Sequence, residues 1–306
     1  MMQRTKILLT GATGLVGTDL LEVLLANQYE VSVLAKANHT FPKEVNHIVF
    51  DAAKDNLKEA LQTEVVPDVI VHNAGVKVIG NSEEELSLIE KVNIQFSEEL
   101  IQFAIKNKIA KFLFTSTFSA ISRPLPELIT EQSAVAPIHA YGNSKMIIEK
   151  KLEDAFLNSE TDYVVFRLSS PISKNLSLLP DTILRKWLVR ASAGQDLELT
   201  GSGLRFQDFI STQDFANLIL AAVSSKVPSG TYNAGSGNGI YFYEIANLIA
   251  NKFKVNVISV GEENPEQWRI GMDKTKAVFQ GNNFESSHDL VVELINNWYH
   301  ANSSVK

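Results

Sequence analysis

A tyrosine and a lysine stand four residues apart in the segment Tyr141-Gly-Asn-Ser-Lys145, and on a helix this spacing puts both side chains on one face. A free tyrosine has a pKa of about 10, and a neighbouring ammonium group favours its phenolate form. Such a pair could donate and accept a proton near neutral pH, and Thr117 could add a hydroxyl that holds the reacting oxygen. The same spacing is common in solvated pairs on surface helices, so the surrounding elements decide between the two interpretations.

The first of these elements lies near the N-terminus, in the stretch KILLTGATGLVG from Lys6 to Gly17. Its apolar run predicts a strand, and the helical spacing of apolar residues from Leu15 to Leu25 predicts a helix after it. Gly11 permits a sharp turn, Gly14 lets a diphosphate approach the backbone, and Gly17 lets the helix pack on the strand. The first amides of the helix would face an anion. The stretch therefore predicts a dinucleotide-binding loop.

Predicted strands and helices alternate along the next part of the chain. Strands are expected at 30–34, 46–50, 67–72, 111–114 and 163–168, and long helices at about 82–106 and 141–158. The strands are rich in Val, Ile, Leu and Phe, as in a parallel sheet covered on both faces. The sequence therefore predicts an α/β fold with a doubly wound, mostly parallel (Rossmann) sheet. Ligands gather at the carboxyl ends of the strands in such a sheet, where Thr117, Tyr141 and the glycine loop would meet.

Beyond residue 168 the alternation loosens, because prolines and glycines interrupt the chain before further predicted elements at 208–210, 214–223 and 230–233. This change predicts a second, smaller unit. We expect a dinucleotide-binding domain at 1–168 and about 208–235, and a smaller C-terminal substrate-binding domain at 169–207 and 236–306.

Composition narrows the classes of function. With 306 residues and 45% hydrophobic content, the chain can bury a sizeable core. The net charge of −7 argues against a nucleic-acid-binding surface, which would need a basic face. The chain has no cysteine, which excludes disulfides and thiolate chemistry, and we expect no metal site. No apolar run approaches the roughly 20 residues that span a bilayer, so we expect a cytoplasmic protein without a membrane partner.

Taken together, these motifs resemble the extended short-chain dehydrogenase/reductases, also called the NAD-dependent epimerase/dehydratase family, over nearly the whole chain. The stretch HNAGVK at 72–77 is similar to the fourth-strand motif of UDP-galactose 4-epimerases, in which the lysine reaches the cofactor. The resemblance implies Thr117, Tyr141 and Lys145 as catalytic residues and a homodimer joined through the two long helices. The implied residues of an NAD or NADP site are Gly11, Thr13, Gly14, Leu15, Val16, Gly17, Asp51, Ala52, Asn73, Ala74, Gly75, Lys77, Asn93, Tyr141, Lys145 and Pro171.

Departures from the family pattern concern the substrate. The UDP-sugar epimerases typically carry an asparagine before the proline and an arginine in a later signature, where this chain has Ser170 and Gln207. Arg205 and Arg269 could grip a diphosphate instead, or could be surface ion-pair residues. We therefore expect substrate contacts from Thr117, Ser170, Arg205, Gln207 and Arg269. The catalytic threonine of sugar-nucleotide 4,6-dehydratases is followed by an Asp-Glu pair that is absent here, which disfavours dehydration.

The end of the second predicted strand differs as well. An NAD site usually has a carboxylate about 20 residues after the glycine loop, where it binds the ribose hydroxyls. Ala35 and Lys36 occupy that end here. Lys36 could face the 2′-phosphate of NADP, which favours NADP(H) at least as much as NAD(H), or it could be an exposed loop lysine.

Three functions follow from these residues. The first is an enzyme that epimerises a nucleotide-diphosphate sugar through a transient keto intermediate, with Tyr141 handling the proton. The second is an NADPH-dependent reductase of a small ketone or aldehyde, and the third is a non-catalytic NAD(P)-sensing regulator. The presence of Thr117, Tyr141 and Lys145 counts against the regulator.

Overall fold

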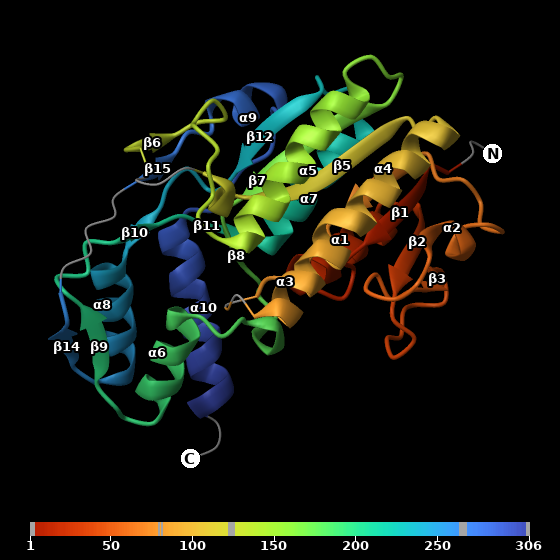
Figure 1. The fold of residues 1–306 in the computed structure, drawn as a ribbon. Coiled ribbons are helices and arrows are strands. Elements are labelled where there is room, and N and C mark those ends of the chain that lie inside the picture. The colour runs from red at the N-terminus through yellow and green to blue at the C-terminus, as the bar shows by residue number, and fades with distance from the viewer. Residues whose placement is uncertain (1–3, 79, 81, 122–125, 263–267, 304–306) are drawn as a thin grey trace.

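A sheet of seven parallel strands, in the order β12-β7-β5-β4-β1-β2-β3, forms the centre of the molecule (Figure 1). The structure is a computed structural model that describes residues 4–78, 80, 82–121, 126–262 and 268–303. The strands are β1 (Lys6–Thr10), β2 (Glu30–Ala35), β3 (Asn46–Val49), β4 (Val69–His72), β5 (Lys111–Thr117), β7 (Asp162–Leu168) and β12 (Gly230–Ala234). Strand order reverses between β1 and β4, so the predicted doubly wound parallel fold is confirmed.

Helices cover both faces of this sheet because successive strand residues point to opposite sides. On β1, for example, Ile7 and Leu9 belong to one apolar core and Leu8 belongs to another. The first core also contains residues of α1 (Leu15–Ala26) and α7 (Thr212–Ser224). The second contains residues of α2 (Leu57–Ala60), α4 (Phe96–Asn107) and α5 (Ala140–Phe156).

The predicted helix at 82–106 is present, but it changes geometry along its length. It begins as α3 (Glu83–Ile89), whose start is closed by reciprocal hydrogen bonds between Ser82 and Glu85. A π-helical segment, Glu90–Gln95, then joins α3 to α4. Such segments are rare and often lie at functional sites.

The bounds of β5 and of the strand predicted at 208–210 differ from the sequence-based prediction. β5 extends to Thr117, because each of its residues pairs with β7 up to the contact of Thr117 with Leu168. Thr117 is therefore the last residue of the strand rather than the first residue after it. The strand predicted at 208–210 is β11 (Phe209–Ser211), which runs parallel to β8 (Ser170–Ile172) outside the main sheet.

A third apolar core lies in a smaller lobe, at the lower left of Figure 1. Its elements are α6 (Ile183–Ser192), β9 (Leu197–Thr200), α8 (Phe242–Phe253), β14 (Val257–Val260) and α10 (Ser287–Ser303). Apart from Phe209, its buried residues fall within the predicted substrate-binding domain, whose boundaries stay a prediction.

Short elements connect this lobe to the sheet. They are β6 (Leu128–Ile129) paired with β15 (Arg269–Ile270), β10 (Phe206–Gln207) paired with β13 (Ile240–Tyr241), and α9 (Asp273–Val278) beside β12. Within the described part of the chain, no helix combines the length and the apolar character needed to cross a membrane.

Candidate active site

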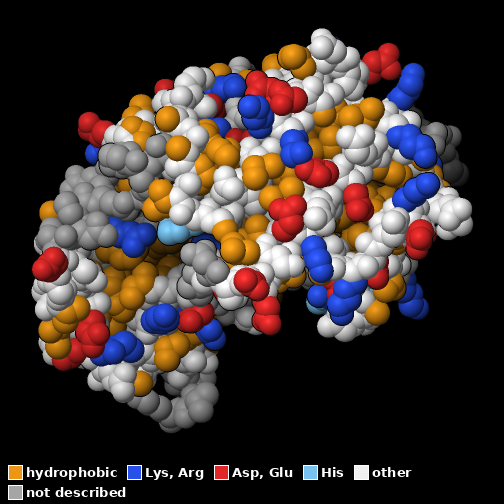
Figure 2. Space-filling model, in the orientation of Figure 1, with side chains coloured by type: hydrophobic (Ala, Val, Ile, Leu, Met, Phe, Trp, Pro, Cys, Tyr) orange, Lys and Arg blue, Asp and Glu red, His pale blue; other side chains and the backbone are white. Residues whose placement is uncertain are grey.

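A cleft of about 990 Å³ follows the carboxyl ends of the central strands and reaches the smaller lobe. Figure 2 shows the surface hollowed between these two parts of the molecule. Pockets for small molecules and cofactors commonly enclose about 300–1,000 Å³, so this cleft is at the large end of the range. It can hold an extended ligand and a second molecule beside it.

The charges in the cleft have one sign. Lys36, Lys77, Lys145 and Arg205 line it, and no Asp or Glu is among the described residues of its lining. This contrasts with the net charge of −7 of the whole chain. A cleft lined by charges of one sign raises the local concentration of ligands of the opposite sign, so the site suits anions.

The glycine loop forms one end of the cleft as the sequence predicts. Gly11 has a positive φ of 73°, which permits the turn from β1 into the loop. A Cβ on Gly17 would lie 1.9 Å from the carbonyl oxygen of Gly11, so only glycine allows α1 to pack this closely. No side chain caps the start of α1, and its first turn contains no acidic residue. The amides of this turn are therefore available to an anionic group.

The three predicted catalytic residues meet in the middle of the cleft. Thr117 ends β5, while Tyr141 and Lys145 lie one turn apart at the start of α5. A hydrogen bond joins the side chains of Tyr141 and Thr117. The Lys145 ammonium donates to the carbonyl oxygens of Thr115 at 2.9 Å and Ala74 at 3.4 Å. One site therefore holds a phenol, a hydroxyl and an ammonium group together.

The pKa of Tyr141 departs from the sequence-based expectation. Burial raises it to about 12, and the hydrogen bond with Thr117 only partly opposes this effect. Burial also lowers the pKa of Lys145 to about 8, against the opposing charge of Glu149. The net pKa of Tyr141 is thus raised, whereas a lowered value was expected, because burial dominates and the Lys145 ammonium donates to backbone carbonyls. At neutral pH Tyr141 is therefore a protonated phenol.

Arg205 and Gln207 reach the cleft from the smaller lobe. The guanidinium carbon of Arg205 lies 5.1 Å from the centre of the Phe242 ring. The Gln207 side-chain amide donates to the Ser170 hydroxyl at 2.7 Å. The two departures from the family pattern, Ser170 and Gln207, are thus hydrogen-bond partners.

The sequence profile of the NAD dependent epimerase/dehydratase family matches residues 7–235, which run from β1 to the end of β12. The match therefore covers more than half of the chain. The chain belongs to the NAD dependent epimerase/dehydratase family. The resemblance seen in the motifs is confirmed, and with it a cofactor of the NAD(P) type.

The chain is similar over most of its length to two UDP-glucose 4-epimerases, one of them putative. The UDP-glucose 4-epimerase of Halalkalibacterium halodurans is 24% identical over 260 residues, which cover 78% of each chain. A putative UDP-glucose 4-epimerase of Methanocaldococcus jannaschii is 23% identical over 306 residues, covering 97% of this chain and 99% of that protein.

Solved structures have the same fold. The UDP-glucose 4-epimerase of Thermotoga maritima, solved with UDP-glucose, superposes with a TM-score of 0.83 at 20% identity and covers 99% of this chain and 100% of that one. The UDP-glucuronic acid 4-epimerase of Bacillus cereus in complex with NAD has a TM-score of 0.81 at 20% identity, with 97% of each chain covered.

Most of the cofactor residues implied by the family resemblance line the cleft: Gly11, Thr13, Gly14, Leu15, Val16, Ala52, Asn73, Ala74, Gly75, Lys77, Tyr141, Lys145 and Pro171, and Lys36 joins them. The residues of this family member fit a dinucleotide, because the glycine loop and the uncapped start of α1 suit its diphosphate and no described residue of the lining is a carboxylate. Gly17, Asp51 and Asn93 lie outside the lining.

Asp51 pairs with the lysine that the sequence places at the cofactor. Its carboxylate lies 3.4 Å from the Lys36 ammonium and 3.8 Å from that of Lys54. Burial acts to raise the pKa of Asp51, but the amide of Ala53 and the Lys36 charge outweigh it and lower the pKa. Lys36 thus lines the cleft, and its ammonium pairs with the Asp51 carboxylate, which lies outside the lining.

Asn93 lies in the π-helical segment, outside the lining of the cleft but in contact with it. Its side chain accepts from the amide of Val76 at 2.8 Å and donates to the carbonyl of Val76 at 2.9 Å. It also donates to the Ser144 hydroxyl at 3.0 Å, and Ser144 donates to the carbonyl of Tyr141 at 2.8 Å. Asn93 therefore ties the loop that carries Lys77 to the start of α5.

His72, from the HNAGVK stretch, is a buried structural residue. Its Nδ1 lies 2.7 Å from the Thr10 hydroxyl and its Nε2 lies 2.7 Å from the Ser97 hydroxyl. Burial, and then the charge of Lys145, hold the pKa of His72 well below its usual range. The ring is neutral and links β1, β4 and α4.

At the substrate end, Thr117, Ser170, Arg205 and Gln207 line the cleft, but Arg269 does not. Arg269 is exposed on β15, and its neighbour Trp268 lines the cleft instead. Sequence reasoning also missed Ser116, Ser119 and Phe242. A weak signal existed for Ser116 and Ser119, because both lie within two residues of Thr117 in the sequence. No signal pointed to Phe242 or Trp268.

Proposed function

We propose that this chain epimerises a sugar that is joined to a nucleoside diphosphate. The observation that carries the proposal is the charge of the cleft, in which Arg205 but no described carboxylate accompanies the cofactor residues and the catalytic group of Thr117, Tyr141 and Lys145. A small neutral ketone needs no cationic binding site beyond that of the cofactor. A substrate with a diphosphate does, because phosphate oxygens accept charge-assisted hydrogen bonds. The UDP-sugar 4-epimerases to which the chain is similar support the same class of substrate.

Each catalytic side chain has a role in proton transfer. A bound nicotinamide dinucleotide supplies hydride transfer. Tyr141 exchanges the proton of the reacting hydroxyl, and the side chain of Thr117 holds that oxygen through the change between alcohol and carbonyl. Lys145, anchored on the Thr115 carbonyl, would place positive charge in the cleft, where it could hold the ribose of the dinucleotide.

Arg205 is the proposed contact for the substrate diphosphate. Its guanidinium group is exposed in the cleft and rests on the Phe242 ring, which leaves its N–H groups available. Trp268 and Phe242 would supply apolar surface to the sugar or the base. Gln207 and Ser170 bond to each other and would offer neutral polar contacts.

We also propose that the site accepts NADP(H) at least as well as NAD(H). Lys36 lines the cleft at the end of β2, and no described carboxylate lines it there. A 2′-phosphate could share the Lys36 ammonium with Asp51, or replace Asp51. As partner, we propose a second copy of this chain, because α3 and α4 carry exposed leucine and isoleucine side chains.

The reaction is tested by mixing the protein with catalytic NAD and one of UDP-glucose, UDP-galactose, UDP-N-acetylglucosamine or UDP-glucuronic acid, and following the sugar by NMR. We expect one of these to give its C4 epimer with no net reduction of the cofactor. Tyr141→Phe should lower turnover by about 10²–10⁴-fold and leave cofactor affinity unchanged. Stoichiometric consumption of NADPH with simple ketones or aldehydes, together with no binding of UDP, dTDP, GDP or CDP in calorimetry, would replace the epimerase with the reductase.

A further inference from the structure

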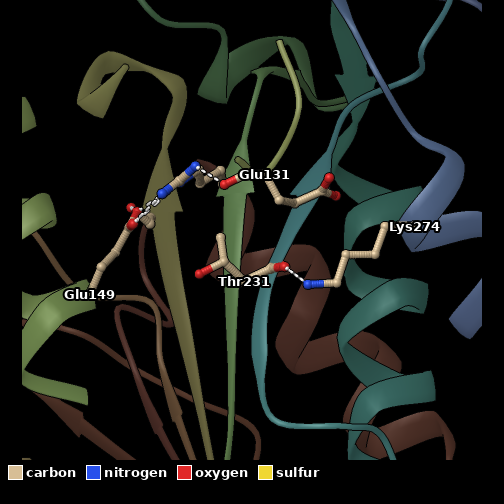
Figure 3. Close-up of polar contacts among 6 residues, drawn as sticks. Glu131, Glu149, Thr231 and Lys274 are labelled. Atoms are coloured by element: carbon tan, nitrogen blue, oxygen red, sulfur yellow. Dashed lines mark hydrogen bonds and ion pairs between the residues drawn. The ribbon is translucent and has the colours of Figure 1, made fainter. Parts of the chain in front are cut away.

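A buried ion pair lies behind the catalytic residues, between α5 and β7. The carboxylate of Glu149 accepts hydrogen bonds from Arg167, from Nη2 at 2.8 Å and from Nε at 3.2 Å (Figure 3). Both side chains are less than one tenth exposed. Removing two charges from water costs free energy that their mutual attraction repays only in part, so such a pair is weak evidence for stability alone.

On one side the pair contacts the catalytic elements. The hydroxyl of Ser116 donates to the Glu149 carboxylate, and Ser116 lines the cleft between Thr115 and Thr117. Glu149 also follows Lys145 by four residues on α5, so the two side chains share one face of the helix. The carboxylate therefore holds the end of β5 and lies on the same face of α5 as Lys145.

On the other side the pair contacts the wall of the cleft. Nη1 of Arg167 donates to the carbonyl oxygen of Glu131 at 3.1 Å (Figure 3), and the Glu131 carboxylate accepts from the Asn233 amide at 2.9 Å. The Asn233 side chain donates to the carbonyl of Ile129 at 3.1 Å. Ile129 lines the cleft. The contacts therefore run from α5 through the sheet to the wall of the cleft.

We propose that Glu149 and Arg167 form a positioning pair, in which Glu149 places a negative charge on the helix face of Lys145 and Arg167 holds that charge in place while fixing the segment around Glu131. The proposal rests on the proposed role of Lys145 but not on the identity of the substrate.

The groups around Lys145 support this assignment. Burial lowers the pKa of Lys145 to about 8, and Glu149 is the charge that opposes this effect. From β4, His72 faces Lys145 as a neutral ring, since its pKa lies well below the usual range. Tyr141 is a protonated phenol, and Lys77, whose ammonium lies 6.0 Å from the centre of the Tyr141 ring, adds positive charge. Among these neighbours of Lys145, Glu149 is the anion that favours the charged form of the lysine.

The test measures the titration of Lys145 in the protein without added substrate. Protein labelled with [¹³C]lysine gives a signal for Lys145 that is assigned by its loss in Lys145→Met. In Glu149→Gln we expect the midpoint to move to lower pH by about one pH unit, as for a charge removed at this spacing in a partly screened site. Glu153→Gln removes an exposed carboxylate from the same helix and should leave the midpoint where it is in the wild type.

A double variant separates positioning from stability. Glu149→Gln leaves the Arg167 guanidinium buried without its partner, so we expect its unfolding midpoint to fall by about 5–10 °C. Glu149→Gln/Arg167→Met removes both charges and should regain most of the lost unfolding temperature. If the single variant does not fold, the Lys145 titration is measured in this double variant. We expect its Lys145 midpoint to stay shifted and its turnover to stay about 10- to 100-fold below wild type.

Two outcomes would overturn the proposal. One is an unchanged Lys145 midpoint in the folded variants, and the other is full recovery of turnover in the double variant, which would make the pair purely structural. Because the titration needs no substrate, a failure of the proposed epimerase reaction would leave its result intact.

Discussion

Lys145 is a catalytic candidate whose position costs the protein stability. It is 4% exposed, and burial lowers its pKa from 10.5 to about 8. Below pH 8 the ammonium is charged in both the folded and the unfolded chain, so folding carries the full cost of its burial. Between pH 8 and 10.5 only the unfolded chain holds the proton, and the contribution of Lys145 to stability rises with pH.

Lys145→Met should therefore stabilise the protein at pH 7 while it abolishes turnover. The shift in pKa corresponds to an upper limit of about 3 kcal/mol in the free energy of unfolding. Urea unfolding at pH 7 and pH 10 measures the gain, which should shrink at the higher pH. Lys151→Met, at an exposed position on the same helix, should change stability by less than about 0.5 kcal/mol. A Lys145→Met protein less stable than wild type at pH 7 would contradict the argument.

Lys36 tests the choice of cofactor at a single position. Lys36→Glu should lower the ratio of NADP to NAD affinity by about tenfold or more, because it replaces a cation in the cleft with an anion that repels the 2′-phosphate. Lys54→Glu is the matched control, since Lys54 also pairs with Asp51 but lies outside the lining. Calorimetric titration of both cofactors into each variant gives the ratio. An equal ratio in wild type and Lys36→Glu would remove Lys36 as the reader of the phosphate.

The spacing of residues predicted where the catalytic groups lie but not how they titrate. Tyr141 and Lys145 share a helix face because of their four-residue spacing, and this was visible in the sequence. The depth of their burial depends on strands and helices far away in the chain. The raised pKa of Tyr141 was therefore not visible in the sequence. Arg269 illustrates the same limit, because a two-residue strand turns it outward while Trp268 lines the cleft.

At the scale of elements, Gly14 and Gly17 stand three residues apart and have different roles. A Cβ on Gly17 would lie 1.9 Å from the Gly11 carbonyl oxygen, whereas a Cβ on Gly14 would meet the same atom at 3.5 Å, an ordinary contact. Gly17 therefore serves the packing of α1 on the glycine loop that follows β1. Gly14 leaves room for a ligand.

Gly14→Ala and Gly17→Ala should accordingly fail in different ways. We expect Gly14→Ala to fold with a thermal midpoint close to that of wild type and to bind dinucleotide at least tenfold more weakly, because its methyl group occupies the approach of the diphosphate. Gly17→Ala should lose several kcal/mol of stability or not fold, because backbone atoms must move. Thermal unfolding and cofactor titration on both proteins provide the check. Equal loss of stability in the two variants would refute the division of roles.

Elements with a strong local signal were predictable, and elements that depend on distant partners were not. The glycine turn, the strands of the central sheet and α5 follow from apolar patterning and from glycine positions. The apolar spacing across 82–106 predicts one continuous helix. The sequence therefore does not reveal the π-helical segment at Glu90–Gln95. The extension of β5 to Thr117 comes from its pairing with β7.

At the scale of the whole molecule, chain segments that are far apart in the sequence build the cleft together. Its lining includes the glycine loop, the end of β5, the start of α5, and Arg205 with Gln207. Parallel pairing places these segments at one edge of the sheet. The pairing of β11 with β8 brings the smaller lobe beside them. The sequence predicts the edge from the order of strands. That no described residue of the lining is a carboxylate emerges only when the segments are assembled.

The face that carries α4 and α5 is the proposed contact with a second copy of the chain. Figure 2 shows apolar side chains among charged ones on this side of the molecule, where Figure 1 places the two helices. Leu86 on α3 and Ile105 on α4 are exposed apolar residues of this region. Homo-oligomers of soluble proteins are most often two-fold dimers, in which both copies use the same surface.

Light scattering coupled to size exclusion should give a mass of two chains for the wild type at micromolar concentration. Leu86→Glu/Ile105→Glu places four carboxylates in the two-fold interface, where their burial and mutual repulsion should shift the protein to the mass of one chain. Ile258→Glu replaces an exposed apolar residue on β14 of the smaller lobe and should leave the dimer intact. If the wild type has the mass of one chain, or if Ile258→Glu dissociates it and the double variant does not, the contact lies elsewhere or does not form.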